Sequence, residues 1–333
     1  MTLSFAHIPF LKPILIFIAV IFCVVLCAVA VIYFWPLKSK ALQNPTKETL
    51  SYEVATKQIA DEKASEKSLQ LRENCGSKLY THGKQTERAI VMLHGYTACP
   101  SQFDALAKIF YDRGYNVYIP REPHHGIVGD SRQYSPMDAA DMVQYASTSV
   151  TRGSGLGKHV GVIGLSGGGV LATWAAQYRD DVVQRALVLS PFYRPAASQV
   201  PAWQIRPLAM LYGNKILPDN FSEQPHKGFS FYGLGQYLKI VENYDTNKNL
   251  PNLQRLALVY SEGDTAIDHN LAQKIPSQLA AANPQTSYEQ YAIPKTWGVG
   301  HDIVMANQPD INHHEAELFA RYVELYEKSA TVK

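Results

Sequence analysis

The sequence predicts an α/β protein, in which one three-layer domain with a mostly parallel sheet and helices on both faces follows an N-terminal transmembrane helix. Two patterns in the 333 residues support this fold class. From about residue 75 onward, short β-rich segments alternate with longer segments of helical periodicity. Several of the β-rich segments are apolar throughout, which is typical of parallel strands buried on both faces.

Residues 14–35 read ILIFIAVIFCVVLCAVAVIYFW and contain no charge. This length is sufficient to span a hydrocarbon core of ~30 Å at ~1.5 Å per residue, and Tyr33 and Trp35 suit the headgroup interface. A cleavable signal peptide is the alternative, because Ala28-Val29-Ala30 resembles a cleavage site. The apolar segment continues past that site, however, and is long for a signal peptide. We therefore predict a single-pass signal anchor, which would lie in the inner membrane of a bacterium.

Residues 36–72 are polar, and alternating charges stand among good helix formers. This composition predicts a juxtamembrane helical stalk that docks at most lightly on the domain. The α/β domain itself is expected over residues 73–330.

The alternation gives the expected elements of the domain in order. Strands are expected at 88–95, 115–120, 158–166, 185–192, 255–264 and 286–294, and helices at 101–114, 135–153, 167–179 and 310–328. Residues 193–250 interrupt this rhythm and are rich in Pro, Gly, Asn and aromatic residues. They are interpreted as an inserted cap, whose aromatic side chains either form only its own small core or also line a pocket.

The segment 161–169 reads GVIGLSGGG, an apolar strand that ends in a serine among glycines. It fits the pattern G-x-S-x-G and opens a segment with apolar residues at helical spacing. A nucleophile on such a turn has a strained backbone with positive φ, so Gly164 and Gly168 are expected to remove side chains that would collide. A glycine-rich anion loop is the alternative, but no P-loop lysine follows. Ser166 is therefore the candidate nucleophile.

A serine nucleophile needs a base and an acid, and on this kind of fold they follow in the order Ser, Asp or Glu, His. The acid is expected just after the strand that follows the cap, where Asp264 is preferred over Glu262 and Asp268. The base is expected between the last strand and the last helix, where TWGVGHDIV supplies His301. The other candidates for the base fit the order less well; they are His269, His313 and His314.

The oxyanion formed during acyl transfer needs two backbone N–H donors. The residue after the nucleophile, Gly167, supplies one candidate. The other is expected in the loop after an early strand, where Leu93-His94-Gly95-Tyr96 points to the N–H of Tyr96.

The segments MLHGYTACPSQF, PREPHHG, GLSGGG, SEGDTAID and GVGHD occur in this order. From about residue 75 to 330 the chain resembles the α/β-hydrolases, nearest the monoglyceride-lipase-like or serine-aminopeptidase-like branch of bacterial esterases. The resemblance implies the α/β-hydrolase fold. It also implies that the loop with Tyr96 supplies an oxyanion donor and that Asp264 is the acid of the catalytic group with Ser166 and His301. Two departures stand out: His124-His125-Gly126 replaces the family's G-H-G, and Gly167 stands where the family often has Met. We expect Gly167 to widen the site.

The chain has four cysteines, at positions 23, 27, 75 and 99. Residues 81–86 are expected to form a hairpin turn between SKLYTH and RAIVML, which would bring Cys75 close to Cys99. A disulfide between them is then possible, with two free buried thiols as the alternative. A disulfide places the domain outside the cytoplasm, whereas Lys38, Lys40 and Lys47 after the apolar segment, against Lys12 before it, lean slightly toward a cytoplasmic domain. An extracytoplasmic domain is preferred.

Lys and Arg number 31 against 29 Asp and Glu, so the charge gives no sign of nucleic-acid binding. The sequence contains neither CxxC nor HExxH, and we expect no metal and no cofactor. The predicted function is a membrane-anchored serine hydrolase that cleaves carboxylic esters through an acyl-enzyme, with an acyl ester or lipid-like small molecule as substrate. Alternatives are a thioesterase or amidase of the same fold, or a non-catalytic membrane-tethered binding protein. A dehalogenase is disfavoured, because dehalogenases use an acid where Ser166 stands.

Overall fold

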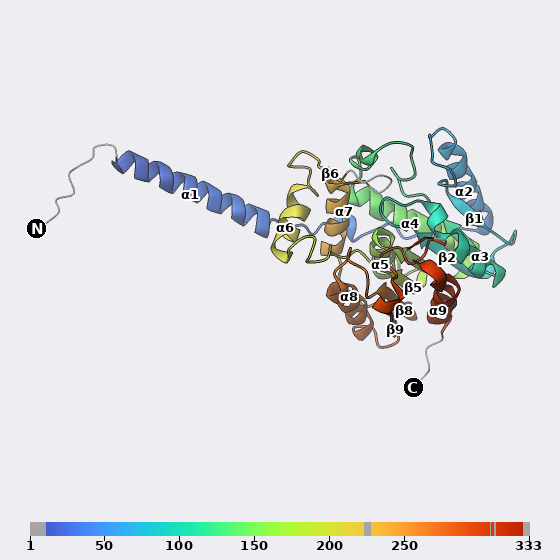
Figure 1. The fold of residues 1–333 in the computed structure, drawn as a ribbon. Helices are drawn as coiled ribbons and strands as arrows, with labels where there is room; N and C mark the ends of the chain where they lie inside the picture. The colour runs from blue at the N-terminus through green and yellow to red at the C-terminus, as the bar shows by residue number, and fades with distance from the viewer. Residues whose placement is uncertain (1–10, 223–227, 307, 310, 329–333) are drawn as a thin grey trace, which may run out of the picture.

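A computed structural model describes residues 11–222, 228–306, 308–309 and 311–328. At its centre lies a seven-stranded sheet in the order β1-β3-β2-β4-β5-β8-β9 (Figure 1). Every pairing is parallel except that between β1 and β3, which confirms the predicted α/β fold. The strands are β1 (Lys78–Tyr80), β2 (Thr86–Leu93), β3 (Asn116–Ile119), β4 (Gly157–Leu165), β5 (Val183–Leu189), β8 (Arg255–Ser261) and β9 (Ser287–Ile293).

Helices cover both faces of the sheet. Side chains of β2 alternate between the two cores, with Val91 and Leu93 in one and Ile90 and Met92 in the other. The first core also contains residues of α4 (Ala139–Leu156), α5 (Gly167–Tyr178) and α8 (His269–Ala281), and the second contains residues of α3 (Asp104–Asp112) and α9 (Glu315–Glu327). Helix α8 was not expected, since Pro276 inside it obscures the helical pattern.

Short 3₁₀ turns occupy several of the connections between these elements. They are η1 (Lys40–Leu42), η2 (Pro100–Phe103), η3 (Ser131–Tyr134), η4 (Lys295–Trp297) and η5 (Asn312–His314).

The expected hairpin between SKLYTH and RAIVML is wrong. Strand β1 pairs antiparallel with β3, and Lys78 lies opposite Ile119. Both edges of β2 are occupied, by β3 and β4, so no edge remains for β1. Because β3 runs parallel to β2, an antiparallel partner of β3 still begins at the carboxyl end of β2. Cys75 therefore reaches the loop after β2 by a route other than the one predicted.

The segment after the apolar helix packs more closely on the domain than a lightly docked stalk would. Helix α2 (Tyr52–Glu66) lies along α4, and Ile59 is buried in the first of the two cores, which is called the main core below. A Cβ atom at Gly155 of α4 would lie 2.5 Å from Cβ of Ala55, so the two helices touch at a glycine. Further upstream, Leu42 is buried, and its carbonyl accepts a hydrogen bond from Nε1 of Trp174 at 2.6 Å.

The chain between β5 and β8 leaves the sheet and forms the segment interpreted as a cap. It contains α6 (Ala202–Leu211), the two-residue strands β6 (Phe221–Ser222) and β7 (Phe229–Ser230), and α7 (Phe231–Glu242). Some of its aromatic side chains, such as Phe229 and Phe231, pack in a small cluster around Leu208 and Leu238. Tyr237 instead belongs to the main core and is fully buried.

Helix α1 (Leu11–Phe34) projects away from the domain beside α6 (Figure 1). Its residues Pro13–Phe34 have a mean hydropathy of 3.5 and are not buried, so this helix is a candidate membrane span by length and composition. Its carboxyl end is attached to the cap. The hydroxyl of Tyr33 donates to the carbonyl of Trp203 at 2.9 Å, and Arg206 donates to the carbonyls of Tyr33 and Trp35.

Candidate active site

Ser166 stands between the end of β4 and the start of α5. Its backbone has φ 56° and ψ −115°, a conformation that L-residues rarely adopt. Backbone hydrogen bonds on both sides stabilise this strained conformation. On the side of the sheet, the N–H of Ser166 donates to the carbonyl of Leu189 in β5. On the other side, the Ser166 carbonyl accepts from Val170 in α5 and from Phe192. The side chain is therefore presented at the carboxyl end of the sheet, at the amino end of a helix.

The glycines at the turn leave no space for side chains. A Cβ atom at Gly164 would lie 2.1 Å from the carbonyl oxygen of Gly168. A Cβ atom at Gly168 would lie 1.9 Å from the carbonyl oxygen of Leu93 in β2. Both obstacles are backbone atoms, which cannot rotate away as a side chain can. The turn around Ser166 thus requires glycine on both sides.

Ser166, His301 and Asp264 lie in one hydrogen-bonded row. Nε2 of His301 is 2.8 Å from Oγ of Ser166, and Nδ1 is 2.7 Å from Oδ2 of Asp264. A carboxylate can only accept, so Nδ1 carries the imidazole proton and Nε2 of the neutral ring accepts from the serine hydroxyl. Burial alone would raise the pKa of Asp264, but the hydrogen bond and the charge of His301, together with the N–H of Ala266, outweigh burial and lower the pKa. The second oxygen of Asp264 accepts from the N–H of Ala266.

The other acids and histidines considered from the sequence have different neighbours. Asp268 caps α8 and pairs with Arg194, and Glu262 accepts from the N–H of Lys295. His269 begins α8, and the His314 ring stacks on Trp297 with centroids 3.9 Å apart. His313 lies beside His314 in η5.

The loop after β2 lies directly against Ser166. A Cβ atom at Gly95 would lie 3.5 Å from Cβ of Ser166. The N–H of Gly95 donates to Oε1 of Gln102 at 2.8 Å, and the Gly95 carbonyl lies 3.0 Å from Nδ1 of His94. The next N–H in the chain is that of Tyr96, the predicted oxyanion donor. The Tyr96 hydroxyl reaches the cap, where it donates to the Ser230 carbonyl and accepts from the Ser230 N–H, both at 3.0 Å.

The expectation that Gly167 widens the site is wrong. A Cβ atom at Gly167 would lie 2.7 Å from Cζ and 2.9 Å from the hydroxyl oxygen of Tyr237 in α7. The space that a side chain at position 167 would take is therefore filled by a tyrosine of the cap. No local pattern indicates this contact, because the two residues are 70 positions apart in the chain.

Glu122 lies behind Tyr237 and is buried, with 1% of its surface exposed. The Tyr237 hydroxyl contacts both of its carboxyl oxygens, at 3.0 and 3.1 Å. Burial raises the pKa of Glu122 to about 8, against a smaller lowering effect of the Tyr237 hydrogen bond. Burial likewise lowers the pKa of His94 to about 4. At neutral pH, Glu122 is therefore a carboxylic acid and His94 a neutral imidazole.

A disulfide joins Cys75 to Cys99, at the end of the loop that contains Gly95 and Tyr96. Gly126 packs on it: φ there is +72°, and a Cβ atom would lie 2.8 Å from Cβ of Cys75. The disulfide thus fastens the segment before β1 to the loop beside Ser166. The other two cysteines, Cys23 and Cys27, are free and exposed on α1.

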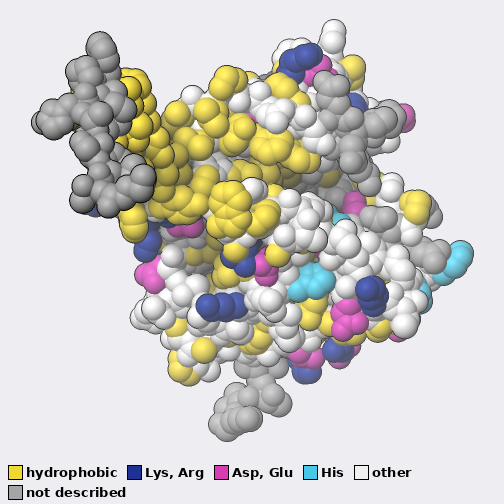
Figure 2. Space-filling view, turned by 60° about the vertical axis from the view of Figure 1, so that its left-hand side comes forward, with side chains coloured by type: hydrophobic (Ala, Val, Ile, Leu, Met, Phe, Trp, Pro, Cys, Tyr) yellow, Lys and Arg dark blue, Asp and Glu magenta, His cyan; other side chains and the backbone are white. Residues whose placement is uncertain are grey.

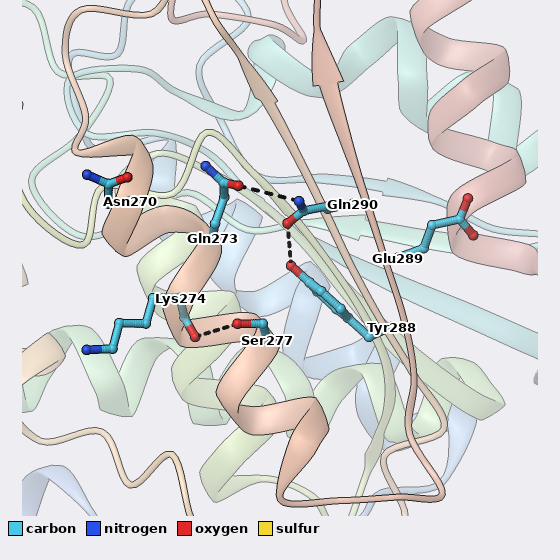
Figure 3. Close-up of a pocket in the computed structure, with 7 residues that line it drawn as sticks. All are labelled: Asn270, Gln273, Lys274, Ser277, Tyr288, Glu289 and Gln290. Atoms are coloured by element: carbon cyan, nitrogen blue, oxygen red, sulfur yellow. Dashed lines mark hydrogen bonds between the residues drawn. The ribbon is translucent and has the colours of Figure 1, made fainter.

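A surface pocket of about 660 Å³ lies between α8 and β9 (Figure 3). Strand β9 is at the edge of the sheet, whereas β4, which leads to Ser166, is at its centre. The lining of the pocket is polar and includes none of the three hydrogen-bonded residues; it comprises Asn270, Gln273, Lys274, Ser277, Tyr288, Glu289 and Gln290. Within the part of the chain that the structure describes, no group of three or more His, Cys, Asp or Glu residues is arranged to hold a metal ion.

Residues 90–311 match the model of the alpha/beta hydrolase family, and the chain belongs to this family. Among curated proteins, no sequence matches the chain. Solved structures of the same fold include a metagenome-derived lipolytic enzyme from a study of LipS and LipT, with a TM-score of 0.57 and 16% identity over 76% of this chain and 98% of that one.

Two further structures of the same fold are monoglyceride lipases. That of Paleococcus ferrophilus, a monoacylglycerol lipase, has a TM-score of 0.56 and 15% identity over 74% of this chain and 96% of the other. A soluble variant of the Saccharomyces cerevisiae enzyme, bound to a substrate analogue, has a TM-score of 0.55 and 12% identity over 76% and 92%. The solved neighbours thus lie in the lipase and esterase branch predicted from the motifs.

Three residues beside the site were not found from the sequence: Gln102, Glu122 and Tyr237. Each lies in a segment whose local pattern indicates only a helix, a loop or the cap. A buried glutamine or glutamate has no distinguishing sequence signal, because its partners come from other parts of the chain.

Proposed function

We propose that this protein is a serine hydrolase that cleaves carboxylic esters and is anchored to a membrane by α1. The observation that carries the proposal is the row of hydrogen bonds from Ser166 through His301 to Asp264, built on a strained turn at a helix amino end. The fold by itself supports hydrolysis only in general terms, since α/β-hydrolases serve many reactions.

In the proposed reaction, Oγ of Ser166 attacks the ester carbonyl and passes its proton to Nε2 of His301. Asp264 keeps the ring in the required tautomer and stabilises the imidazolium. His301 then gives the proton to the leaving alcohol, which departs and leaves an acyl-serine. Water attacks the acyl group and gives a proton to Nε2 of His301, which passes it to Oγ of Ser166 as the bond to the acyl group breaks and the acid departs.

The developing oxyanion would be held by the N–H groups of Gly167 and Tyr96. Gly167 begins α5, where unpaired N–H groups and the helix dipole favour negative charge. The peptide that carries the Tyr96 N–H also carries the Gly95 carbonyl. In a trans peptide these two groups point in opposite directions, so the bonds from His94 and from the N–H of Ala98 to the carbonyl fix the direction of the Tyr96 N–H.

A lipid-like acyl ester is the substrate class that the surroundings of α1 support. Hydrophobic side chains gather where α1 meets the cap (Figure 2). Exposed large hydrophobic side chains at the carboxyl end of α1 and in the cap include Phe34, Trp35, Trp203, Ile216 and Leu217. Because α1 is bonded to α6, a membrane that holds α1 brings this part of the cap to its surface. The similar structures, a lipolytic enzyme and two monoglyceride lipases, agree with such a substrate.

The proposed location of the domain is the extracytoplasmic side of the membrane. The disulfide between Cys75 and Cys99 supports this side, because disulfides persist in oxidising compartments. Protease treatment of intact and of permeabilised cells tests the assignment. Digestion of the domain only after the cytoplasm is opened would contradict it.

A fluorophosphonate probe tests the chemistry of the full-length protein in detergent or in membranes. Wild type is expected to be labelled and Ser166→Ala is not, because the probe reacts with an activated serine. A series of p-nitrophenyl esters of rising chain length then defines the acyl preference. Labelling of Ser166→Ala equal to that of wild type would overturn the proposal, and absence of both labelling and ester hydrolysis in wild type would favour a binding protein.

A further inference from the structure

The two proposed oxyanion donors come from distant parts of the chain, Tyr96 after β2 and Gly167 at the start of α5. Both lie against one element of the cap, α7. Tyr96 holds the residue before α7 through two hydrogen bonds to Ser230, and the rings of Tyr96 and Tyr237 are 5.3 Å apart. Gly233 of α7 leaves space for Tyr96, since a Cβ atom there would lie 2.2 Å from its hydroxyl oxygen.

On the Gly167 side, the contact is the ring of Tyr237. The ring occupies the place of a Cβ atom at position 167. It therefore packs against the backbone of Gly167, whose N–H is one of the two proposed oxyanion donors. The ring is fully buried, and its hydroxyl is held by Glu122.

Glu122 connects this contact to the second donor. Its backbone N–H donates to Nε2 of His94 at 3.1 Å. Because Nε2 accepts, Nδ1 of the neutral ring carries the proton and donates to the Gly95 carbonyl. That carbonyl belongs to the same peptide as the Tyr96 N–H. A continuous series of contacts thus runs from Gly167 through Tyr237, Glu122 and His94 to the Tyr96 peptide, and the first four of these residues are buried.

We propose that Tyr237 is a positioning residue of the oxyanion hole: held by Glu122, it fixes the backbone of Gly167 and, through His94, the peptide that carries the Tyr96 N–H. The inference rests on the proposed function. It makes the cap a structural part of the catalytic apparatus, since Tyr237 reaches Gly167 only while α7 is seated on the domain. Stabilisation of the oxyanion and closure of the cap are then linked.

The test compares Tyr237→Phe with Tyr244→Phe in the full-length protein. Tyr244 follows α7, is also buried, and its hydroxyl donates to the carbonyl of Val170 in α5 at 2.7 Å. Each variant therefore loses one buried hydroxyl and its hydrogen bonding near α7, but the side chain nearest to position 167 is that of Tyr237. Thermal unfolding of both variants checks that they are folded to a similar degree.

Three quantities are measured: kcat and KM for a p-nitrophenyl ester, and the inhibition constant of a trifluoromethyl ketone, which forms a tetrahedral adduct with serine. For Tyr237→Phe we expect kcat to fall about 10-fold or more with little change in KM, a part of the 10²–10³-fold cost of losing one oxyanion donor. The inhibition constant is expected to rise by a similar factor, because the adduct resembles the transition state. Tyr244→Phe is expected to leave all three near the wild-type values.

Glu122 supplies a second measurement that does not depend on the Phe variants. Glu122→Gln keeps an acceptor for the Tyr237 hydroxyl and is expected to retain kcat, whereas Glu122→Leu is expected to lose it as Tyr237→Phe does. Equal kcat and equal inhibition in Tyr237→Phe and Tyr244→Phe, in an enzyme whose labelling depends on Ser166, would overturn this inference alone. Absence of Ser166-dependent labelling in wild type would overturn the proposed function and this inference with it.

Discussion

Nε2 of Gln102 donates a hydrogen bond to Oδ2 of Asp302 at 2.9 Å. The same side chain accepts from the N–H of Gly95, so Gln102 joins the loop beside Ser166 to the residue that follows His301. Gln102 is buried and lies within η2, the turn before α3. One amide side chain therefore connects the proposed oxyanion loop to the residue next to the proposed base.

Gln102→Met keeps the volume of the side chain and removes both hydrogen bonds. We expect a loss of stability of about 1–3 kcal/mol, because the N–H of Gly95 is left buried and unpaired. We also expect kcat to fall about 10-fold, since small displacements of reacting groups are costly. Gln177→Met is the control: Gln177 is also buried and bridges two backbone groups, but at the far end of α5. A kcat loss equal in both variants would contradict the assignment.

Asp264→Asn tests which carboxylate serves His301. Asparagine cannot hold the His301 ring in the tautomer that Asp264 imposes. We therefore expect kcat to fall about 10⁴-fold, as in serine hydrolases with the same Ser-His-Asp arrangement. Asp268→Asn is the matched variant, four residues away. It weakens the pair with Arg194 and the cap of α8, and is expected to lower stability with kcat near wild type. Steady-state kinetics with one ester would decide between them, and the reverse pattern would assign the role to Asp268.

Glu122→Gln is expected to change how stability depends on pH. The pKa of Glu122 is raised to about 8 in the folded protein, against 4.5 as the ordinary value. Above pH 4.5 the unfolded chain releases this proton while the native protein keeps it, so this group lowers the stability progressively as pH rises to about 8. Glutamine has no proton to keep, and the variant should gain stability relative to wild type over this interval, by up to several kcal/mol.

The measurement is urea unfolding of both proteins at pH 5 and pH 8.5. The other titratable side chains around Glu122 are the same in both proteins, and burial raises the pKa of the tyrosines well above 10 and lowers that of the histidines; they are Tyr96, Tyr145, Tyr237, His94, His124 and His125. A stability difference that is the same at both pH values would show that Glu122 is ionised at neutral pH.

Removal of the disulfide by Cys75→Ser with Cys99→Ser is expected to lower stability by about 3 kcal/mol, the value for a closed loop of this size in the chain-entropy model. The sequence separation of 24 residues sets that loop. Cys23→Ser with Cys27→Ser is the control, because these cysteines are free. Thermal unfolding with and without a reductant gives the comparison. Wild type that is as stable in reductant as without it would contradict the prediction.

The amino-acid sequence by itself determined the fold class, the apolar span and the order of Ser166, Asp264 and His301. These features depend on local patterns: continuous apolar strands, helical periodicity, and glycines at positions where a Cβ atom meets backbone. The sequence also indicated that Cys75 and Cys99 lie close together, although the hairpin on which that prediction depended does not form.

Only the tertiary structure decided what surrounds Ser166. Strand β1 pairs at the edge of the sheet because β2 already has two neighbours, and pairing of this kind is set by competition among all strands. Tyr237 fills the space beside Gly167 because the cap folds back onto α5. A glycine in a sequence shows where a side chain is absent. Whether that space is open or occupied depends on residues far away in the chain, which come together only when the core is packed.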